Sequence, residues 1–339
     1  LQLEPKSAPI HEEFAELYDA MIGTATAERR DFCRTQRLDH LVKAVNHDKS
    51  ARSPRVRLLG LAMAEDGAQD AVYWAREVVK LDPADLDSNF VLAFDALESR
   101  SPNLPEVKRQ IKVLEDGNAP EVRRLLLQAR LADVTGDESG RNAALAAGRK
   151  LQLPADAGPT DLMAKLRLTA LDVQTRTDAA ERAEQVKSML AVSDRILATA
   201  EPGSQRVTRL SYLMEQTQRD LIRQSRAGDV AKADGVDPVI ETIETQLASI
   251  FDKSRKAGDR VDFQMYLTYA DHLRFRQERD RCLQVVDEAM ALPIAARPSS
   301  AQIAMGLHVV ASEMALGKSD DDARFEKAAP HIAALIAST

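Results

Sequence analysis

The spacing of proline and glycine residues constrains this chain more than any other feature. The segment LDPAD at Leu81–Asp85 recurs as QLPAD at Gln152–Asp156, and the two prolines lie 71 residues apart. Gly67 and Gly136, each between two helical segments, lie 69 residues apart. Both intervals are close to two periods of about 35 residues, which is the length of one pair of helices with its turns. A chain with this spacing is expected to stack similar helix pairs, each burying an apolar face against its neighbours.

Apolar residues recur along the chain at the period of an α-helix. They form one predicted face in 239–251 (Ile240, Ile243, Leu247, Ile250 and Phe251) and another in 26–46 (Phe32, Leu38, Leu41, Val42 and Val45). No alternating pattern predicts a strand longer than about four residues. Proline or glycine marks most boundaries, and the predicted helices span approximately 10–22, 26–46, 54–65, 68–81, 86–99, 104–115, 119–134, 138–151, 159–175, 178–200, 203–227, 238–256, 260–276, 279–291, 298–316 and 320–337. Pro330 lies inside the last segment, where it is expected to kink the helix or to begin a new one.

The composition of the 339 residues supports an all-α chain. Alanine is abundant, with 52 residues, whereas there are only 14 aromatic residues and 14 glycines. Alanine favours closely packed helices, and β-architectures need more β-branched and aromatic residues. The scarcity of glycine also argues against nucleotide-binding folds that are built on glycine loops.

Two segments resemble the tetratricopeptide repeat (TPR) at the level of single residues. In 52–85 the pattern is matched by the helix A pair Leu59 and Gly60, the turn residue Gly67, the small helix B residues Ala71 and Ala75, and the closing Leu81-Asp82-Pro83. In 263–294 it is matched by Tyr266, Tyr269, Ala270 and Leu273 in helix A, by Cys282, Val286, Ala289 and Leu292 in helix B, and by Pro293. The segment 122–155 matches less fully, through Ala129, Gly136 and the small residues of 143–148. In such repeats small residues let two helices approach closely, and large ones fill the groove of the neighbouring repeat.

The resemblance implies an all-α fold, a right-handed superhelix of antiparallel helix pairs. We expect an N-terminal helical cap in 1–51, TPR-like repeats in 52–158, longer irregular helices in 159–257, and C-terminal repeats with a cap in 258–339. The repeat pattern is poor in 159–257, and 225–238 is predicted as a flexible loop because it contains Gly228, Gly235 and Pro238.

Charge and hydropathy restrict the class of partner. The net charge is −7 and both signs are interspersed, so no basic stripe indicates a nucleic-acid interface. No segment has the ~18 apolar residues of a membrane span, and the first residues do not form a basic and then apolar leader. The two cysteines, Cys33 and Cys282, are expected to be small buried side chains without a disulfide. This usage favours a reducing compartment, such as the cytoplasm, and leaves the periplasm open.

We find no motif that indicates catalysis, a cofactor or a metal. The sequence contains no phosphate-binding glycine loop, GxSxG, HExxH or CxxC. His40 and His47 share a helix face but lie two turns apart, and the histidines are interpreted as surface residues. The three aspartates of 320–322 are interpreted as helix caps rather than a magnesium motif. Trp74, the only tryptophan, falls at a packing position of helix B, which argues against a sugar-stacking cleft.

The expected function is that of a non-catalytic scaffold or adaptor that binds a protein or peptide. In the family that the chain resembles, helix A residues line the concave, partner-binding face; the corresponding residues here are Asp87, Phe90, Phe94, Arg123, Leu126, Arg130, Thr268, Asp271 and Arg274. One alternative is a regulatory or sensor module of a larger protein. Another is an all-helical enzyme with a cleft in 159–257, which a deep pocket with converging carboxylates would favour. Self-association is also left open, because an uncapped end of a helix stack exposes apolar surface.

Overall fold

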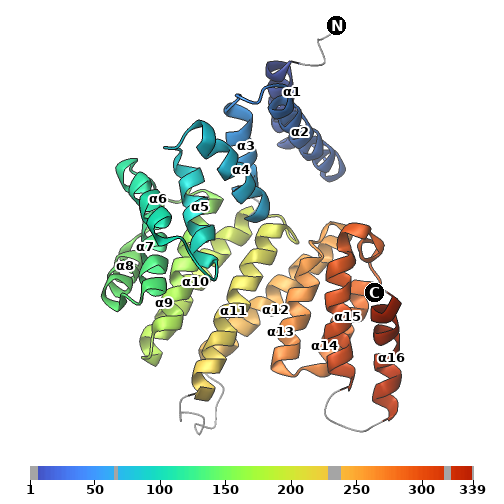
Figure 1. Cartoon of the computed structure of the whole chain (residues 1–339). Coiled ribbons are helices and arrows are strands. Elements are labelled where there is room, and N and C mark those ends of the chain that lie inside the picture. Colours follow the sequence, from blue (N-terminus) through green and yellow to red (C-terminus); the bar gives the residue numbers. More distant parts are fainter. Residues whose placement is uncertain (1–6, 65–67, 228–237, 317–321, 338–339) are drawn as a thin grey trace. The chain divides into compact units, whose positions relative to one another are not determined.

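The computed structural model describes residues 7–64, 68–227, 238–316 and 322–337, and within these ranges it contains sixteen α-helices and no β-strand (Figure 1). The first eight are α1 (Ala8–Ile22), α2 (Ala27–His47), α3 (Ser53–Ala64), α4 (Ala68–Leu81), α5 (Leu86–Glu98), α6 (Leu104–Asp116), α7 (Glu121–Thr135) and α8 (Glu138–Lys150). The others are α9 (Pro159–Thr175), α10 (Ala179–Thr199), α11 (Gln205–Ala227), α12 (Pro238–Ser254), α13 (Gln264–Arg276), α14 (Arg279–Met290), α15 (Ala301–Leu316) and α16 (Asp322–Ala337). Short 3₁₀ helices, η1 (Arg255–Arg260), η2 (Pro293–Ala296) and η3 (Pro298–Ser300), lie in two of the connections. Each predicted helix is present, with ends within four residues of the prediction.

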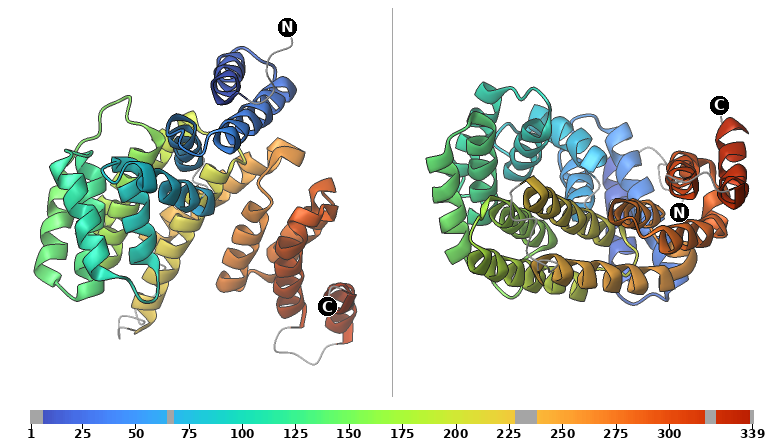
Figure 2. Two further views of the ribbon diagram at one scale, coloured as in Figure 1. Left: turned by 45° about the horizontal axis from the view of Figure 1, so that its top comes forward. Right: turned by 90° about the horizontal axis from the view of Figure 1, so that it is seen from below.

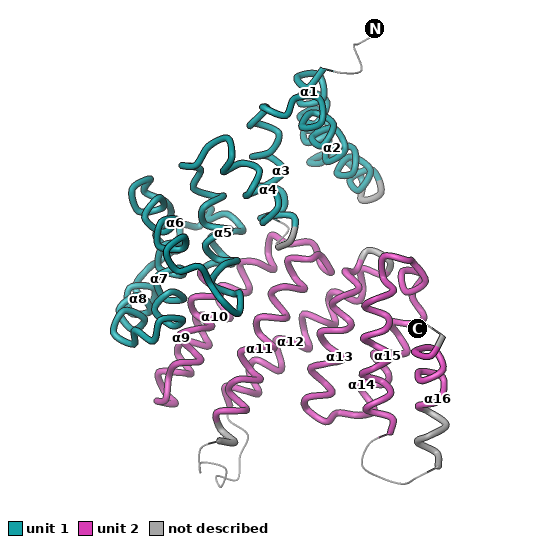
Figure 3. The backbone as a smooth tube through the Cα atoms, viewed as in Figure 1, with its two compact units in different colours: residues 1–164 teal, residues 165–339 magenta. Residues whose placement is uncertain are grey.

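The helices form two compact units, residues 1–164 and 165–339 (Figure 3). In unit 1, α1 packs against α2, α3 against α4, α5 against α6 and α7 against α8, and α5 also contacts both α3 and α7. In unit 2, α11 packs against α12, α13 against α14 and α15 against α16, and α13 also contacts both α11 and α15 (Figure 2). We use the term first helices for those that begin a pair and also contact each other in succession, namely α3, α5 and α7 in unit 1 and α11, α13 and α15 in unit 2. The chain is therefore an all-α solenoid of helix pairs within each unit, which confirms the predicted fold class.

The local sequence explains where many of these helices begin and end. Four of them follow an aspartate or asparagine whose side chain accepts a hydrogen bond from a backbone N–H of the first turn: Asp85, Asn103, Asp137 and Asp178. α7 ends at Gly136, whose φ of 72° is a left-handed conformation that glycine adopts at little cost. Helices α9 to α12 contain 17–23 residues, whereas α3 to α8 contain 12–15. The chain therefore contains a stretch of longer helices after the first four pairs.

Most side chains that carry the repeat pattern are buried. These are Leu59, Ala71 and Ala75 in the first matching segment and Tyr266, Tyr269, Ala270, Leu273, Cys282, Val286 and Ala289 in the last. The close helix approach predicted at Gly60 is wrong, because this residue is exposed and a Cβ there would meet no atom within 4 Å. A close approach is found at Gly306 of α15, where a Cβ would come within 2.9 Å of the Leu267 side chain of α13. Small residues thus bring helices together in unit 2 at a position that the pattern did not indicate.

The apolar face predicted for α2 does not form one buried surface. Leu41 and Val45 are buried, whereas Phe32, Leu38 and Val42 are exposed. In contrast, all five apolar residues of the face predicted in 239–251 are buried. The reason is the packing around each helix, since α2 packs against α1 and α3, whereas α12 packs against α10, α11 and α13.

Predictions for single residues and short segments can be compared with the structure one by one. Trp74 packs against the buried cluster between α1, α2 and α3, as its predicted packing role requires. Cys33 and Cys282 are buried and form no disulfide, as predicted. α16 continues through Pro330, and no new helix begins there. Gly67, residues 228–237 of the predicted loop and residues 317–321 lie outside the described ranges. No helix among the described residues is long and apolar enough to cross a membrane.

Candidate functional site

In unit 1 an arginine joins three helices. Arg123 of α7 forms an ion pair with Asp87 of α5, and its Nε donates a hydrogen bond to Asp161 Oδ1 of α9 at 2.6 Å. Its guanidinium carbon also lies 5.5 Å from the centre of the Phe90 ring. Three residues predicted as partner contacts, Asp87, Phe90 and Arg123, are thus brought together, and they contact one another within their own unit.

The other predicted residues of unit 1 differ in their exposure. Phe90 and Leu126 are buried, so they are core side chains of the unit. Phe94 is half-buried and stacks on Phe90, with ring centres 6.3 Å apart. Arg130 forms an ion pair with Glu98 of α5 at 2.6 Å and a second one on its own helix. The side chains of this set that reach the surface are therefore mostly charged and already paired.

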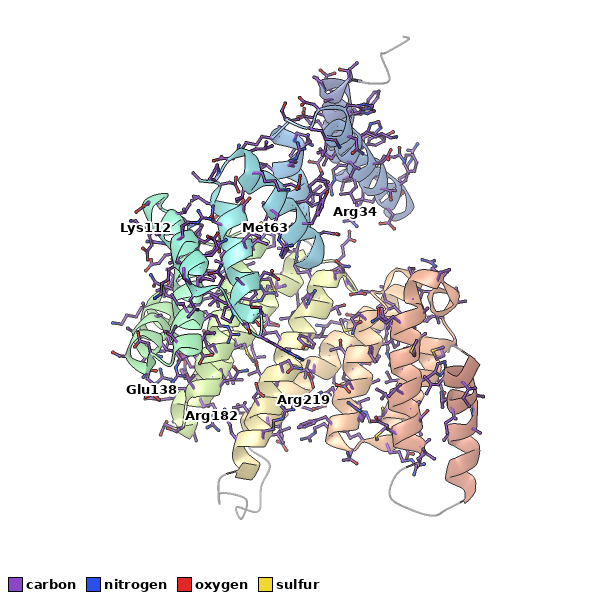
Figure 4. The ribbon with its side chains drawn as sticks, in the orientation of Figure 1. Arg34, Met63, Lys112, Glu138, Arg182 and Arg219 are labelled. Carbon is purple, nitrogen blue, oxygen red and sulfur yellow. The ribbon has the colours of Figure 1, made fainter. Side chains whose placement is uncertain are left out.

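In unit 2 a row of ion pairs crosses α11, α13 and α15. Arg219 of α11 donates to Glu215 on the same helix at 2.6 Å and to Asp271 of α13 at 2.9 Å. Asp271 also accepts from Arg274, which forms an ion pair with Glu313 of α15. We call these five residues the charge ladder; Arg219 is labelled in Figure 4. The ladder joins three neighbouring first helices, and it includes two residues predicted from the sequence, Asp271 and Arg274.

Burial dominates the electrostatics at the α11 end of the charge ladder. Glu215 is buried, and desolvation raises the pKa of its carboxyl, although the neighbouring Arg219 acts to lower it. His272 of α13 is also buried, with its Nε2 2.7 Å from Glu244 Oε2. Burial acts to raise the pKa of Glu244, but hydrogen bonds from His272 and Gln218 hold it below its usual value. The interpretation of the histidines as surface residues is therefore wrong for His272.

A small cavity lies between α11, α12 and α13. It is lined by Ser211, Glu215, Leu247, Phe251, Met265, Thr268, Tyr269 and His272. Its volume accommodates about one water molecule, so a substrate does not fit. Thr268, predicted as a partner contact, is buried and faces this cavity. The cavity contains one carboxylate, Glu215, whereas an enzyme in this region would need a deep pocket with converging carboxylates.

Exposed apolar side chains lie on the helices at both ends of the charge ladder. Tyr212 of α11 is 49% exposed, and Met305, Val309 and Leu316 of α15 are 40%, 40% and 38% exposed. The three α15 residues are spaced i, i+4 and i+11, which places them on one face of the helix. We call these four residues together with the charge ladder the unit 2 face. Sequence reasoning missed the four apolar residues, and the helical spacing on α15 was the signal that could have found them.

Two histidine pairs join helices, one in each unit. His11 Nδ1 of α1 lies 2.9 Å from His40 Nδ1 of α2, and the His47 ring stacks on His11 with ring centres 5.2 Å apart. His308 of α15 and His331 of α16 form a similar pair at 3.0 Å. Desolvation and the neighbouring imidazole lower the pKa of His40 and of His308. No group of three His, Cys, Asp or Glu residues in the described part of the chain is arranged to hold a metal ion.

Comparisons with known proteins add little to this geometry. No protein-family model matches the sequence, and no curated protein matches it. Among solved structures, the chain is similar to the crystal structure of the TPR domain of P58(IPK), with 14% sequence identity and a TM-score of 0.26. The similarity covers 97% of this chain and 99% of that chain. The assignment as an all-α solenoid therefore rests on the helix pairing of the chain itself.

Proposed function

We propose that this chain is a non-catalytic scaffold that binds a protein or peptide partner on the unit 2 face. One observation carries this proposal. The charge ladder links α11, α13 and α15, and the helices at its two ends, α11 and α15, expose Tyr212, Met305 and Val309. Tyrosine and methionine are enriched at protein interfaces, where a few large side chains carry most of the binding energy. The exposed apolar residues are therefore the proposed anchors.

The charge ladder supports this function by holding its helices in place. Its arginines and carboxylates already pair with one another, so a partner gains little by contacting them. Side chains that are ordered before binding also reduce the entropy that association costs. Asp271 and Arg274 are thus proposed as residues that keep the face rigid, and Tyr212 and the α15 residues as those that contact the partner.

The charge next to the anchors indicates the chemistry of the partner. Arg209 and Arg223 are exposed on α11, on the same side of that helix as Tyr212, and Arg223 forms an ion pair with Asp220 at 3.3 Å. We therefore expect a partner segment that has apolar side chains for α15 and a carboxylate for Arg209 of α11.

The residues predicted in unit 1 have a secondary place in this proposal. Asp87, Phe94, Arg123 and Arg130 reach the surface in part, and we propose them as a second, weaker contact surface. Phe90, Leu126 and Thr268 are buried, so we assign them to the packing that supports the two surfaces.

Photo-crosslinking of the full chain tests this proposal. The photoreactive residue p-benzoylphenylalanine replaces Tyr212 in one protein and Val309 in another, and each is irradiated in a lysate of the source organism. We expect both proteins to form an adduct with the same polypeptide. The matched control carries the residue at Gln284, an exposed position on α14, which is outside the unit 2 face.

A competing variant separates the face from the rest of the chain. Met305→Asp combined with Val309→Asp changes only partly exposed side chains, so the helical circular dichroism signal is expected to persist while capture of the polypeptide is lost. The proposal is wrong if Gln284 gives the same adduct as Tyr212 and Val309, or if neither face position gives any adduct.

A further inference from the structure

A serine hydroxyl is buried at the small cavity between α11, α12 and α13. Ser211 of α11 lines this cavity and is 4% exposed, and its Oγ forms no hydrogen bond with any residue that the structure describes. A buried hydroxyl without a hydrogen bond is costly, because it has given up its contacts with water and received none in return. Buried polar groups therefore nearly always have a partner, which is either a protein group or an ordered water molecule.

The side chains that line the cavity form a polar group and an apolar group. The polar residues are two pairs with i, i+4 spacing on adjacent helices, Ser211 and Glu215 of α11 and Thr268 and His272 of α13. The others are Leu247 and Phe251 of α12 and Met265 and Tyr269 of α13. Residues four apart are neighbours on a helix surface, so each of two helices brings two polar side chains to the same small space.

The cavity is shielded from bulk solvent and matches the size of one water molecule. Each of its lining residues is at most 8% exposed, and the volume accommodates about one water. An apolar space of this size stays dry, whereas a polar one retains a water that finds two to four polar partners. The lining side chains therefore decide whether water is bound, and half of them are polar.

The hydrogen-bonding capacity of the lining residues is sufficient for a water molecule. The Glu215 carboxylate accepts two bonds from Arg219 and one from Gln216, and a carboxylate has about four acceptor sites. A water can donate to Glu215 and to the Thr268 hydroxyl, and it can accept from the Ser211 hydroxyl. About three hydrogen bonds is the usual number for an internal water.

We propose that one internal water molecule is bound in this cavity, where it bridges α11 and α13 through Ser211, Glu215 and Thr268. The occupant is water rather than a cation, because Arg219 already supplies positive charge to Glu215. Since Glu215 also belongs to the charge ladder, the water extends that network into the core of unit 2. This inference concerns the packing of unit 2, and it does not depend on partner binding.

Magnetic relaxation dispersion of the water signal tests the proposal on the full chain, because it counts water molecules that stay bound for longer than the protein takes to tumble. We expect the parent to hold one more such molecule than Ser211→Val, whose larger apolar side chain fills the cavity and removes the hydroxyl. The matched control is Thr208→Val. Thr208 is also a buried residue of α11, but it lies outside the cavity lining, and its hydroxyl donates to the Ser204 carbonyl at 3.3 Å. This variant is expected to keep the count of the parent.

A stability cycle with smaller changes remains decisive if Ser211→Val does not fold. Ser211→Ala and Thr268→Val should each lower the urea midpoint, because each removes a partner of the water. The double variant should lose less than the sum of the two, because both residues act through one molecule. If no water is bound, Ser211→Ala removes a hydroxyl that has no partner, and the midpoint stays the same or rises. That result overturns the proposal, as do additive losses or an equal count of bound water in the parent and Ser211→Val.

Discussion

In each unit an arginine forms ion pairs that join neighbouring helices, but the surroundings of the two arginines differ. In unit 1, Arg123 lies against the buried ring of Phe90, and its partner Asp87 has a side chain that is 45% exposed. In unit 2, Arg219 pairs with Glu215, whose side chain is 3% exposed, and an exposed Tyr212 lies on the same helix. Ion pairs thus join the helices in both units. What distinguishes the unit 2 face is the exposure of apolar side chains next to them.

The largest effect is expected from truncating the aromatic ring in unit 1. Phe90→Ala removes a buried side chain and should lower the free energy of unfolding by about 3 kcal/mol or more. Tyr212→Ala in unit 2 should change it by less than about 0.5 kcal/mol, because that ring is exposed. Urea unfolding followed by circular dichroism measures both. Equal losses of unfolding free energy in the two variants would contradict the assignment of Phe90 to the core and of Tyr212 to the surface.

The two arginines are expected to differ in their contribution to stability. Arg219→Met leaves Glu215 buried without its cation, which should cost about 3 kcal/mol. Arg123→Met leaves Asp87 in contact with water, so the cost should be about 1 kcal/mol. Chemical denaturation of the two variants and the parent gives the comparison. Adding Glu215→Gln to Arg219→Met should recover part of the loss, and no recovery would argue against an uncompensated carboxylate as its cause.

The loss caused by Arg219→Met should also depend on pH. Burial raises the pKa of Glu215 above the unfolded value of 4.5. Ionisation of this group therefore lowers the free energy of unfolding as the pH rises from about 4.5 through the folded pKa. Without Arg219 this cost is larger. The stability difference between variant and parent should therefore be smaller at about pH 5 than at about pH 7.5, and a difference that is constant over this range would contradict the explanation.

Two glycines are expected to respond with opposite signs. Gly60→Ala in α3 should raise the free energy of unfolding by about 0.5–1 kcal/mol, because a helix favours alanine and the site is open. Gly306→Ala in α15 should lower it, because the new methyl group would lie 2.9 Å from a Leu267 methyl carbon. Thermal unfolding midpoints report both changes. A stabilising Gly306→Ala would show that α13 and α15 are packed less closely than described.

The smallest effect is expected from the histidine pairs. The pKa of His40 in unit 1 and of His308 in unit 2 lies below the unfolded value of 6.5. The folded chain therefore binds fewer protons, and the stability from these pairs is complete above about pH 6.5 and decreases as the pH falls towards the folded pKa. The thermal midpoint should fall from about pH 7.5 to about pH 5.5. His40→Gln and His308→Gln should each reduce this dependence, and an unchanged dependence in the double variant would contradict the assignment.

Part of the candidate site could be predicted from the sequence. The positions of Asp271 and Arg274 in the repeat pattern of 263–294 predicted that both lie on the partner-binding face. In the structure both lie in the charge ladder. Their partner Arg219 lies 52 residues before Asp271, on the longer helix α11, where the spacing of the repeat pattern no longer applies. Similarly, His11 meets His40 only because α1 and α2 pack together, and no spacing within one helix indicates that contact.

Local sequence signals are sufficient to place the helices and their approximate ends. These signals act over a few neighbouring positions, so they can be recognised in the sequence. They are the helical period of apolar residues, capping side chains such as Asp85 and Asp137, and turn residues such as Gly136. Which apolar side chains are buried depends instead on how the helices pack together. Phe32 and Phe90 both lie on apolar helix faces, yet Phe32 is exposed and Phe90 is buried. The reason is that α5 is packed by α3, α4, α6 and α7, whereas α2 packs against α1 and α3. Burial depends on helices that are distant in sequence, and no local pattern records how many of them will surround a given side chain.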